Sequence, residues 1–287
     1  MRSLPEFLLE KLKSTNPDAV FTGNMPKIYS STGENYFVKA GSPSENEQYM
    51  GEAQSLEAMG HAAPGLVPKV FSYGADTNGS PYFISEYKNM TGLTEEAAEI
   101  LAKRLAVELH QYKSQRGFGF EVPTYCGATR QKNGWHDTWE KCYDALIGNL
   151  LEGLSKKGYE DLVGLGEEVR NSVIPKLLGQ LNIQPVLLHG DLWSGNVGVD
   201  SSTGQPVIFD PSSYYGHNEA DLAIARIFGG FPESFYAAYH RHYPKAEPVS
   251  QHSLRVELYE LYHYLNHTLL FGVSRYLNKL SLEGAGL

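Results

Sequence analysis

The chain has 287 residues, of which 41% are hydrophobic and 20% charged, and this composition excludes a disordered, collagen-like or coiled-coil protein. The formal charge of −9 disfavours nucleic acid and anionic membranes as partners, and no apolar run approaches the roughly 20 residues that span a bilayer. The two cysteines form no CxxC pattern and support neither a disulfide framework nor a cysteine-based zinc site, so we expect a soluble cytoplasmic protein. The length indicates one elaborate domain or two lobes. The oligomeric state is open, with a monomer as the default.

The first part of the chain is predicted to form strands around one main helix. Residues 1–17 carry the pattern of a short amphipathic helix. Ser44, with Glu47 three residues later, has the pattern of a capping box and predicts a helix that runs to about Met59. A turn is expected at Asn78, which is followed by glycine. Short β-rich segments occur at 19–24, 26–31, 35–40, 69–73 and 81–86.

The rest of the chain is mostly predicted to be helical. Between two of its helices lies a Gly- and aromatic-rich segment, residues 117–135, which is too long for a simple connector and is expected to be a binding loop. The pattern predicts a small β-rich N-lobe, residues 1–88, and a larger helical C-lobe, residues 89–287. Helices are expected at 94–113, 136–156, 163–180 and about 254–269, and two short apolar strands at 185–188 and 206–210.

The strongest chemical signal is the loop HGDLWSGN, residues 189–196, with Asp210 fourteen residues after its asparagine. This spacing is typical of the H-x-D-L-x-x-x-N loop and the downstream aspartate of kinase-type phosphoryl transfer. That chemistry needs ATP and Mg²⁺ held by oxygen ligands, which predicts Asn196 and Asp210 as metal ligands. Asp191 would accept the proton of the attacking hydroxyl. Each residue alone could be a turn residue, but the combination between two apolar strands favours the catalytic interpretation.

Two upstream residues support this interpretation independently. Lys39 ends the strand YFVK, where a kinase presents its phosphate-contacting lysine. Glu52 lies on the apolar face of the next helix, and a carboxylate there requires a partner, for which Lys39 is the natural candidate. The alternative is a solvated helix face, which suits Glu47 and Glu57 better.

Other residues near these motifs leave more than one interpretation open. Glu86, Tyr87 and Lys88 follow the strand PYFIS and could present backbone groups to adenine at a hinge between the lobes. Trp193 could stack on a sugar and donate its indole N–H, or it could pack under the loop. Asp221 could bond the backbone of the 189–196 loop, or it could be a plain helix-end aspartate.

Two histidines and several residues of the final helix could also belong to the site. His189 is expected to be packed and structural because Asp191 already supplies a base, and the role of His217 is open. The Tyr and His residues of the final helix are mostly core by spacing, although one or two of them could line the acceptor site: Tyr259, Tyr262, His263, Tyr264 and His267.

Several runs of the sequence resemble the fructosamine/ketosamine 3-kinase family, an aminoglycoside-phosphotransferase-like branch of the protein-kinase-like fold: HGDLWSGN, IFDPSSYYGHNEADLAIARIFGGFP, SFYAAYHRHYPK and LYELYHYLNHTLLFG. VKAGSPSENEQYMGEAQSLEAM is similar to the family's lysine strand and glutamate helix, and GFGFEVPTYCGATRQKNGW to its insertion, so the resemblance covers most of the chain. It implies a bilobal α+β fold and ATP-dependent phosphorylation of the 3-hydroxyl of ribulosyl- or fructosyl-lysine, free or on glycated protein. Phosphorylation of that hydroxyl destabilises the adduct and returns the free amine.

The resemblance also assigns roles and shows two departures. It implies that Asp191 is the catalytic base and that Asn196 and Asp210 are the metal ligands. It also implies a phosphate-positioning Lys39–Glu52 pair and a hinge at 86–88. Residues 21–26 contain one glycine and no cysteine, so neither a glycine-rich phosphate cradle nor a redox-linked dimer through the N-lobe is expected. Pro211 follows Asp210, which disfavours a flipping switch of the protein-kinase type.

Two alternative functions remain at this stage. One is a kinase of the same fold that acts on another small hydroxylated amine, such as choline or an aminoglycoside. The other is a catalytically inactive binding protein of kinase fold, which the presence of all five motif residues disfavours: Lys39, Glu52, Asp191, Asn196 and Asp210. A Ser/His/Asp hydrolase is weaker still because the sequence has no G-x-S-x-G elbow.

Overall fold

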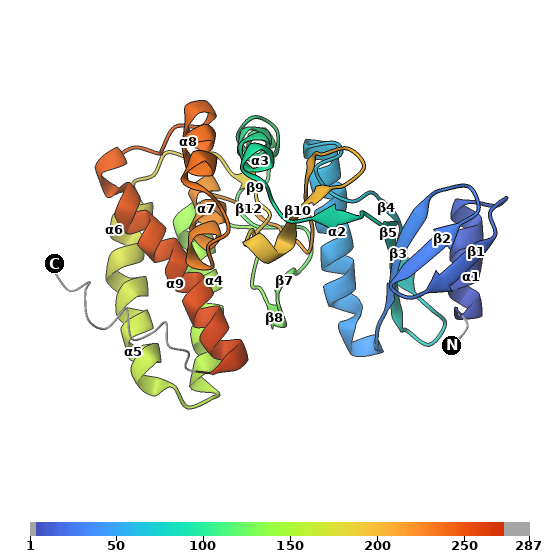
Figure 1. The fold of residues 1–287 in the computed structure, drawn as a ribbon. Helices are drawn as coiled ribbons and strands as arrows, with labels where there is room; N and C mark the ends of the chain where they lie inside the picture. Colours follow the sequence, from blue (N-terminus) through green and yellow to red (C-terminus); the bar gives the residue numbers. More distant parts are fainter. Residues whose placement is uncertain (1–3, 273–287) are drawn as a thin grey trace.

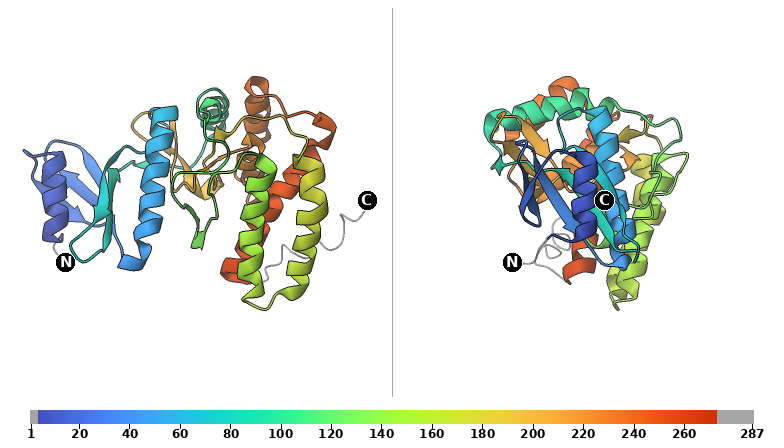
Figure 2. Two further views of the ribbon diagram at one scale, coloured as in Figure 1. Left: turned by 180° about the vertical axis from the view of Figure 1, so that it is seen from behind. Right: turned by 90° about the vertical axis from the view of Figure 1, so that its right-hand side faces the viewer.

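The computed structural model describes residues 4–272, which form a small antiparallel sheet lobe and a larger, mainly helical lobe (Figure 1). The elements of the first lobe are α1 (Glu6–Thr15), β1 (Phe21–Asn24), β2 (Lys27–Ser30), β3 (Asn35–Ala40), α2 (Asn46–Ala62), β4 (Val70–Ala75) and β5 (Pro81–Glu86). The five strands form one sheet of order β1-β2-β3-β5-β4, with neighbouring strands antiparallel. Helix α2 stands between this sheet and the helical lobe in both opposed views (Figures 1 and 2).

Strand β3 places side chains on both faces of the sheet because side chains alternate along a strand. Tyr36 and Val38 are buried in the small core beneath α1, whereas Phe37 packs against the main core on the opposite face. Lys39 lies on the same face of the strand as Phe37, so the alternation directs its side chain toward α2. The five strands and the two helices predicted for this lobe are therefore confirmed.

The capping pair before α2 differs from the prediction. Ser42 and Glu45 form the capping box, with the Ser42 N–H donating to the Glu45 carboxylate at 2.7 Å, and a 3-10 turn leads into α2. Glu47 instead accepts hydrogen bonds from Tyr125 and Arg130 of the 117–135 segment. The predicted Ser44–Glu47 capping box is wrong because the Glu47 carboxylate is bound by Tyr125 and Arg130 instead of by the start of the helix.

The second lobe has most of its helices packed around one large hydrophobic core. Its elements are β6 (Met90–Thr91), α3 (Glu95–Val107), β7 (Tyr125–Cys126), β8 (Thr129–Arg130), α4 (Trp139–Ser155), α5 (Glu160–Glu168), α6 (Ile174–Leu178), β9 (Val186–Leu187), β10 (Val197–Asp200), β11 (Pro206–Ile208), β12 (Tyr215–Gly216), α7 (Asn218–Ile227), α8 (Glu233–His242) and α9 (His252–Phe271). Within residues 4–272 no helix is long and apolar enough to cross a membrane.

Two helix boundaries in this lobe differ from the predictions. Helix α3 ends at Val107, not near residue 113, because the chain turns into a 3-10 segment that places His110 against Asp221 and Tyr239. The helix predicted at 163–180 begins at Glu160 and contains a π-helical turn between α5 and α6. Both differences follow from tertiary contacts that local periodicity does not encode.

A buried ion pair fixes the start of α7. The Glu219 carboxylate accepts two hydrogen bonds from Arg255 of α9, at 2.7 and 3.0 Å, and both side chains are at most 1% exposed. Replacing Arg255 with methionine would leave the carboxylate buried and unpaired, so we expect Arg255→Met to lower the free energy of unfolding by about 3–5 kcal/mol. Chemical denaturation checks this value. As a control, Lys132→Met breaks the exposed Lys132–Glu152 pair and is expected to change stability little.

Candidate active site

The loop after β9 is held in place through its backbone. The Asp221 carboxylate accepts hydrogen bonds from the N–H groups of His189 and Gly190, each at 2.7 Å. Gly190 has φ +82° and a Cβ there would lie 2.2 Å from the Ser212 carbonyl oxygen, so only glycine fits. The predicted supporting contact of Asp221 is therefore present.

The histidine of this loop is packed, as predicted. His189 is fully buried, and its Nε2 lies 3.0 Å from the Phe209 carbonyl oxygen. Burial lowers its pKa, although the charge of Asp221 acts in the opposite direction. His217 is equally buried, with its Nδ1 2.7 Å from the Tyr259 hydroxyl, and burial lowers its pKa to about 4. Both histidines are thus neutral structural groups at physiological pH.

Asp191, Asn196 and Asp210 lie together at the end of this loop. The Asn196 amide N–H donates to the Asp191 carboxylate at 3.2 Å and to the Asp191 and Asp210 backbone carbonyls at 3.0 and 3.4 Å. Its side-chain oxygen accepts no hydrogen bond from the described residues and can bind a cation. Asp210 is exposed and forms no ion pair within residues 4–272. An amide oxygen and a free carboxylate fit the ligand preference of Mg²⁺.

The environment of Asp191 suits a proton acceptor. Burial raises its pKa to about 7, and the negative charges of Asp210 and Asp221 act in the same direction. The Cys126 thiol and the Asn196 amide, which both face the carboxylate, partly offset this shift. A base whose pKa lies near the working pH transfers protons efficiently.

The predicted ion pair between Lys39 and Glu52 is present, joining β3 to α2. The side chains are 24% and 14% exposed, and Lys39 also lies over the rings of Tyr49 and Phe83. Burial raises the pKa of Glu52, and the Asp210 carboxylate raises it further while the Lys39 ammonium opposes both. The influence of Asp210 on Glu52 places the two motifs, more than 150 residues apart in the sequence, at one site.

The segment 86–88 leaves only part of its backbone available. The N–H groups of Glu86 and Tyr87 donate to the carbonyls of Lys69 and Asn35, at 2.8 and 2.9 Å. The Lys88 N–H donates to no described residue. The Lys88 ammonium is bound by Glu86 at 2.6 Å and by Asp200 at 3.1 Å, which ties the end of β5 to β10 of the second lobe.

Trp193 packs on the loop with part of its ring exposed. A Cβ at Gly195 would lie 2.1 Å from its Cη2, and Phe228 contacts the indole edge-on with ring centroids 5.7 Å apart. The side chain nevertheless remains 38% exposed. Packing and ligand contact, the two roles that the sequence left open, are therefore geometrically compatible.

Three adjoining pockets surround these residues. The hinge pocket lies between the lobes and is mainly apolar; the polar pocket beside it shares Glu52 and Asp210 with it. The aromatic pocket, of about 350 Å³, shares Asp191, Trp193 and Gly127 with the polar pocket. The hinge pocket is lined by Phe37, Leu56, Phe83, Glu86, Lys88 and Phe209, the polar pocket by Lys39, Glu52, Asp191, Asn196 and Asp210, and the aromatic pocket by Cys126, Asp191, Trp193, Phe228, His263 and His267.

Some residues of this site were missed by sequence reasoning. Cys126 was considered only for a disulfide framework and a cysteine-based zinc site, both of which the sequence left unsupported, yet it lines the aromatic pocket next to Asp191. His110 was not identified as the third group on Asp221, which it approaches to 3.2 Å. A signal for Cys126 existed, because it lies in the 117–135 segment expected to bind a ligand. His263 and His267, four residues apart on α9, line the pocket as the sequence allowed.

Comparisons with solved structures define the class of fold. The structure superimposes on an aminoglycoside phosphotransferase crystallised with ADP and hygromycin B with a TM-score of 0.61. The two chains are 18% identical, and the superposition covers 94% of this chain and 92% of that one. A Thermobifida fusca protein assigned as a fructosamine-3-kinase gives a TM-score of 0.77 at 28% identity, over 91% of this chain and 90% of that one. The chain therefore has the bilobal, protein-kinase-like α+β fold that was predicted.

Comparisons of sequence define the family. A family model described as fructosamine kinase matches residues 2–281. A chloroplastic protein-ribulosamine 3-kinase of Arabidopsis thaliana is 39% identical over 87% of this chain and 75% of its own length. The ketosamine-3-kinase of Mus musculus is 36% identical over 85% of both chains. The chain belongs to the fructosamine kinase family.

Proposed function

We propose that this chain is an ATP-dependent kinase that phosphorylates the 3-hydroxyl of ketosamines, such as ribulosyl- or fructosyl-lysine, free or on glycated protein. Family membership and the names of the two relatives support the reaction and the substrate class. The observation that carries the proposal is the position of Asp191, which lines both the polar and the aromatic pocket. A hydroxyl held in the second pocket and a phosphate held in the first would meet at this carboxylate.

The three pockets suit three parts of the reactants. We propose that residues 1–88 bind the nucleotide, with adenine in the hinge pocket and the Lys88 N–H as a donor to it, and that residues 89–287 supply the loop and the acceptor site. Lys39, oriented by Glu52, would bind ATP phosphate oxygens. Asn196 and Asp210 would hold Mg²⁺, which supplies neutralisation of phosphate charge when it is bound.

Asp191 would then act on the acceptor. As the hydroxyl oxygen forms its bond to the γ-phosphorus, the bond from phosphorus to the ADP oxygen breaks and the hydroxyl proton passes to the Asp191 carboxylate. The buried Asp221, which binds the backbone on the N-terminal side of Asp191, fixes the direction in which this carboxylate points. We also infer a cytoplasmic location, because both cysteines are free and buried, as a reducing compartment allows.

A panel of acceptors tests the function. Purified protein is incubated with ATP and Mg²⁺ and with ribulosyl-lysine, fructosyl-lysine, the matching free sugars, choline or an aminoglycoside, and ADP release and the phosphorylated product are measured. Turnover that requires the ketosamine linkage supports the proposal. Equal turnover of choline or the aminoglycoside would favour the first alternative, and no turnover of any acceptor would favour an inactive binding protein.

Trp193 is proposed to hold the sugar beside Asp191. Loss of a stacked ring and its N–H costs roughly 1–3 kcal/mol, so Trp193→Ala is expected to raise the KM for a ketosamine by about 5- to 150-fold while the KM for ATP changes little. Steady-state kinetics with each substrate varied in turn measure both constants. Trp193→Phe keeps a ring face without the N–H and should retain part of the affinity. Equal increases in both KM values would indicate general damage to the loop.

A further inference from the structure

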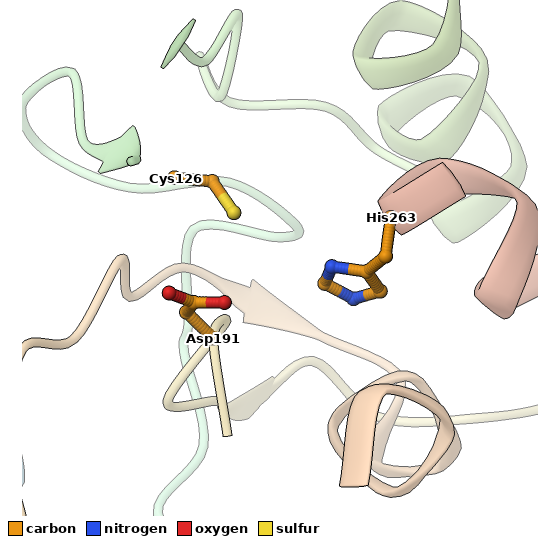
Figure 3. A group of neighbouring side chains, drawn as sticks. All are labelled: Cys126, Asp191 and His263. Atoms are coloured by element: carbon orange, nitrogen blue, oxygen red, sulfur yellow. The ribbon is translucent and has the colours of Figure 1, made fainter. Parts of the chain in front are cut away.

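Three potential metal ligands converge in the aromatic pocket. The Cys126 thiol, the Asp191 carboxylate and an imidazole nitrogen of His263 all lie within 4.8 Å of one another. They come from β7, the loop after β9 and α9, and Figure 3 shows the side chains directed toward a common point. Because the three segments are far apart in the sequence, no spacing motif identifies this cluster.

The three ligands differ in the partners that they already have. The Cys126 thiol has hydrogen-bond contacts with Asp191, Asn266 and Ser212, and the Asp191 carboxylate also accepts from the Asn196 amide. Neither ring nitrogen of His263 forms a hydrogen bond with a described residue, although the side chain is only 7% exposed. Burial lowers the pKa of His263 to about 3, so its imidazole is neutral and keeps a lone pair. Burial also raises the pKa of Cys126 well above its usual range, so the thiol is inert unless a cation displaces its proton.

The ligand types select the cation. A thiolate, an imidazole and a carboxylate are the set that Zn²⁺ binds, whereas Mg²⁺ takes oxygen ligands and rejects sulfur. Zinc with three protein ligands leaves a fourth position for water or substrate, and all three candidate ligands line the aromatic pocket. This arrangement differs from the oxygen ligands Asn196 and Asp210 in the polar pocket, so the two cations would not compete for the same atoms.

We propose that Cys126, Asp191 and His263 form an inhibitory Zn²⁺ site in the aromatic pocket. Binding releases the Cys126 proton to solvent, and the thiolate, the imidazole nitrogen and the carboxylate donate electron pairs to the ion. The Asp191 carboxylate then cannot accept a substrate proton, and the ion occupies space that the acceptor would need. A site that the cysteine count alone did not support is thus assembled by the fold.

Direct metal binding tests the site without reference to activity. Co²⁺ added to the metal-free protein is expected to give a thiolate-to-cobalt charge-transfer absorption in the near ultraviolet, which Zn²⁺ then abolishes. Cys126→Ser should lose this band and weaken zinc binding by at least about 10-fold, since outer-shell groups of metal sites alone contribute 10–100-fold. Cys142→Ser is the matched control, because Cys142 is also buried but lies on α4 outside the three pockets.

Inhibition is measured separately and rests on the proposed function. With a ketosamine acceptor and saturating ATP–Mg²⁺, Zn²⁺ should inhibit competitively with the acceptor, and a chelator should restore activity. Inhibition of each protein is expressed relative to its own zinc-free rate. The inhibitory Zn²⁺ concentration should then be at least about 10-fold higher for Cys126→Ser than for the wild type. His263→Asn provides a second ligand removal if Cys126→Ser fails to fold.

Several outcomes would overturn the proposal. The absence of the cobalt band in a folded, active protein would remove the site. Zinc inhibition that excess Mg²⁺ relieves and that is unchanged in Cys126→Ser would place the ion at Asn196 and Asp210 instead. A cobalt band in a protein with no kinase activity would support the metal site and count against the proposed function, so the two failures are distinguishable.

Discussion

Replacing Asp191 with asparagine is expected to reduce phosphoryl transfer far more than nucleotide binding. The variant Asp191→Asn removes the proposed proton acceptor but leaves Asn196, Asp210 and the Lys39–Glu52 pair in place. A positioned base contributes on the order of 10²–10⁴-fold, so kcat should fall by that factor while the Kd for ATP–Mg²⁺ stays nearly constant. Steady-state kinetics and isothermal titration calorimetry measure the two quantities.

The control for this variant removes a carboxylate elsewhere. Asp137 is an exposed carboxylate, 92% accessible, at the start of α4 and outside the three pockets. Asp137→Asn changes the net charge by the same amount and is expected to leave kcat unaltered. Near-normal kcat in Asp191→Asn would exclude the proton-acceptor role, and loss of ATP binding together with kcat would indicate that the loop had rearranged.

Local sequence patterns predicted much of this site because the relevant residues are close together in the chain. Residues 189–196 form one loop, so their spacing already fixes which side chains share it. The alternation of β3 and the period of α2 placed Lys39 and Glu52 on facing surfaces, and the structure pairs them. Patterns with a period of two or 3.6 residues identify faces, and a buried charge on a face implies a partner.

Other features depend on segments that meet only in the fold. The sequence predicted the strands near 187 and 208, but β9 pairs with β12 and β11 with β10, so the two do not pair with each other. The N–H groups of Glu86 and Tyr87 donate to the carbonyls of Lys69 and Asn35, and no local pattern indicates these partners. Such pairings are decided by packing and not by propensity.

The contact of the 117–135 segment with α2 illustrates the same point. Its Tyr125 and Arg130 bind Glu47, and Gln48 donates to the Gly127 carbonyl at 3.2 Å. The segment was expected to bind a ligand, and it also joins the second lobe to the helix that carries Glu52. A sequence can mark such a segment by its composition but cannot name the helix that it will contact.

The other large effect is expected at Asp210, whose backbone conformation sets it apart from its neighbours. Its φ of +53° is the only positive value for a non-glycine residue between 4 and 272, and its carbonyl oxygen accepts from the Asn196 amide at 3.4 Å. Such conformations are uncommon for non-glycine residues, Asp and Asn tolerate them best, and strained residues cluster at functional sites. The conformation is consistent with a carboxylate positioned for the polar pocket.

Asp210→Ala is therefore expected to lose Mg²⁺-dependent ATP binding. Because even outer-shell groups of metal sites contribute 10–100-fold to metal affinity, loss of the proposed direct ligand should weaken ATP binding at saturating Mg²⁺ by about 100-fold or more. Calorimetry with and without Mg²⁺ measures this, and metal-free ATP binding should change little. Asp210→Asn separates charge from backbone, since asparagine accepts the positive φ and retains an oxygen ligand, so its affinity should lie between those of the wild type and Asp210→Ala. Full Mg²⁺-dependent activity in Asp210→Ala would show that the carboxylate does not hold the metal.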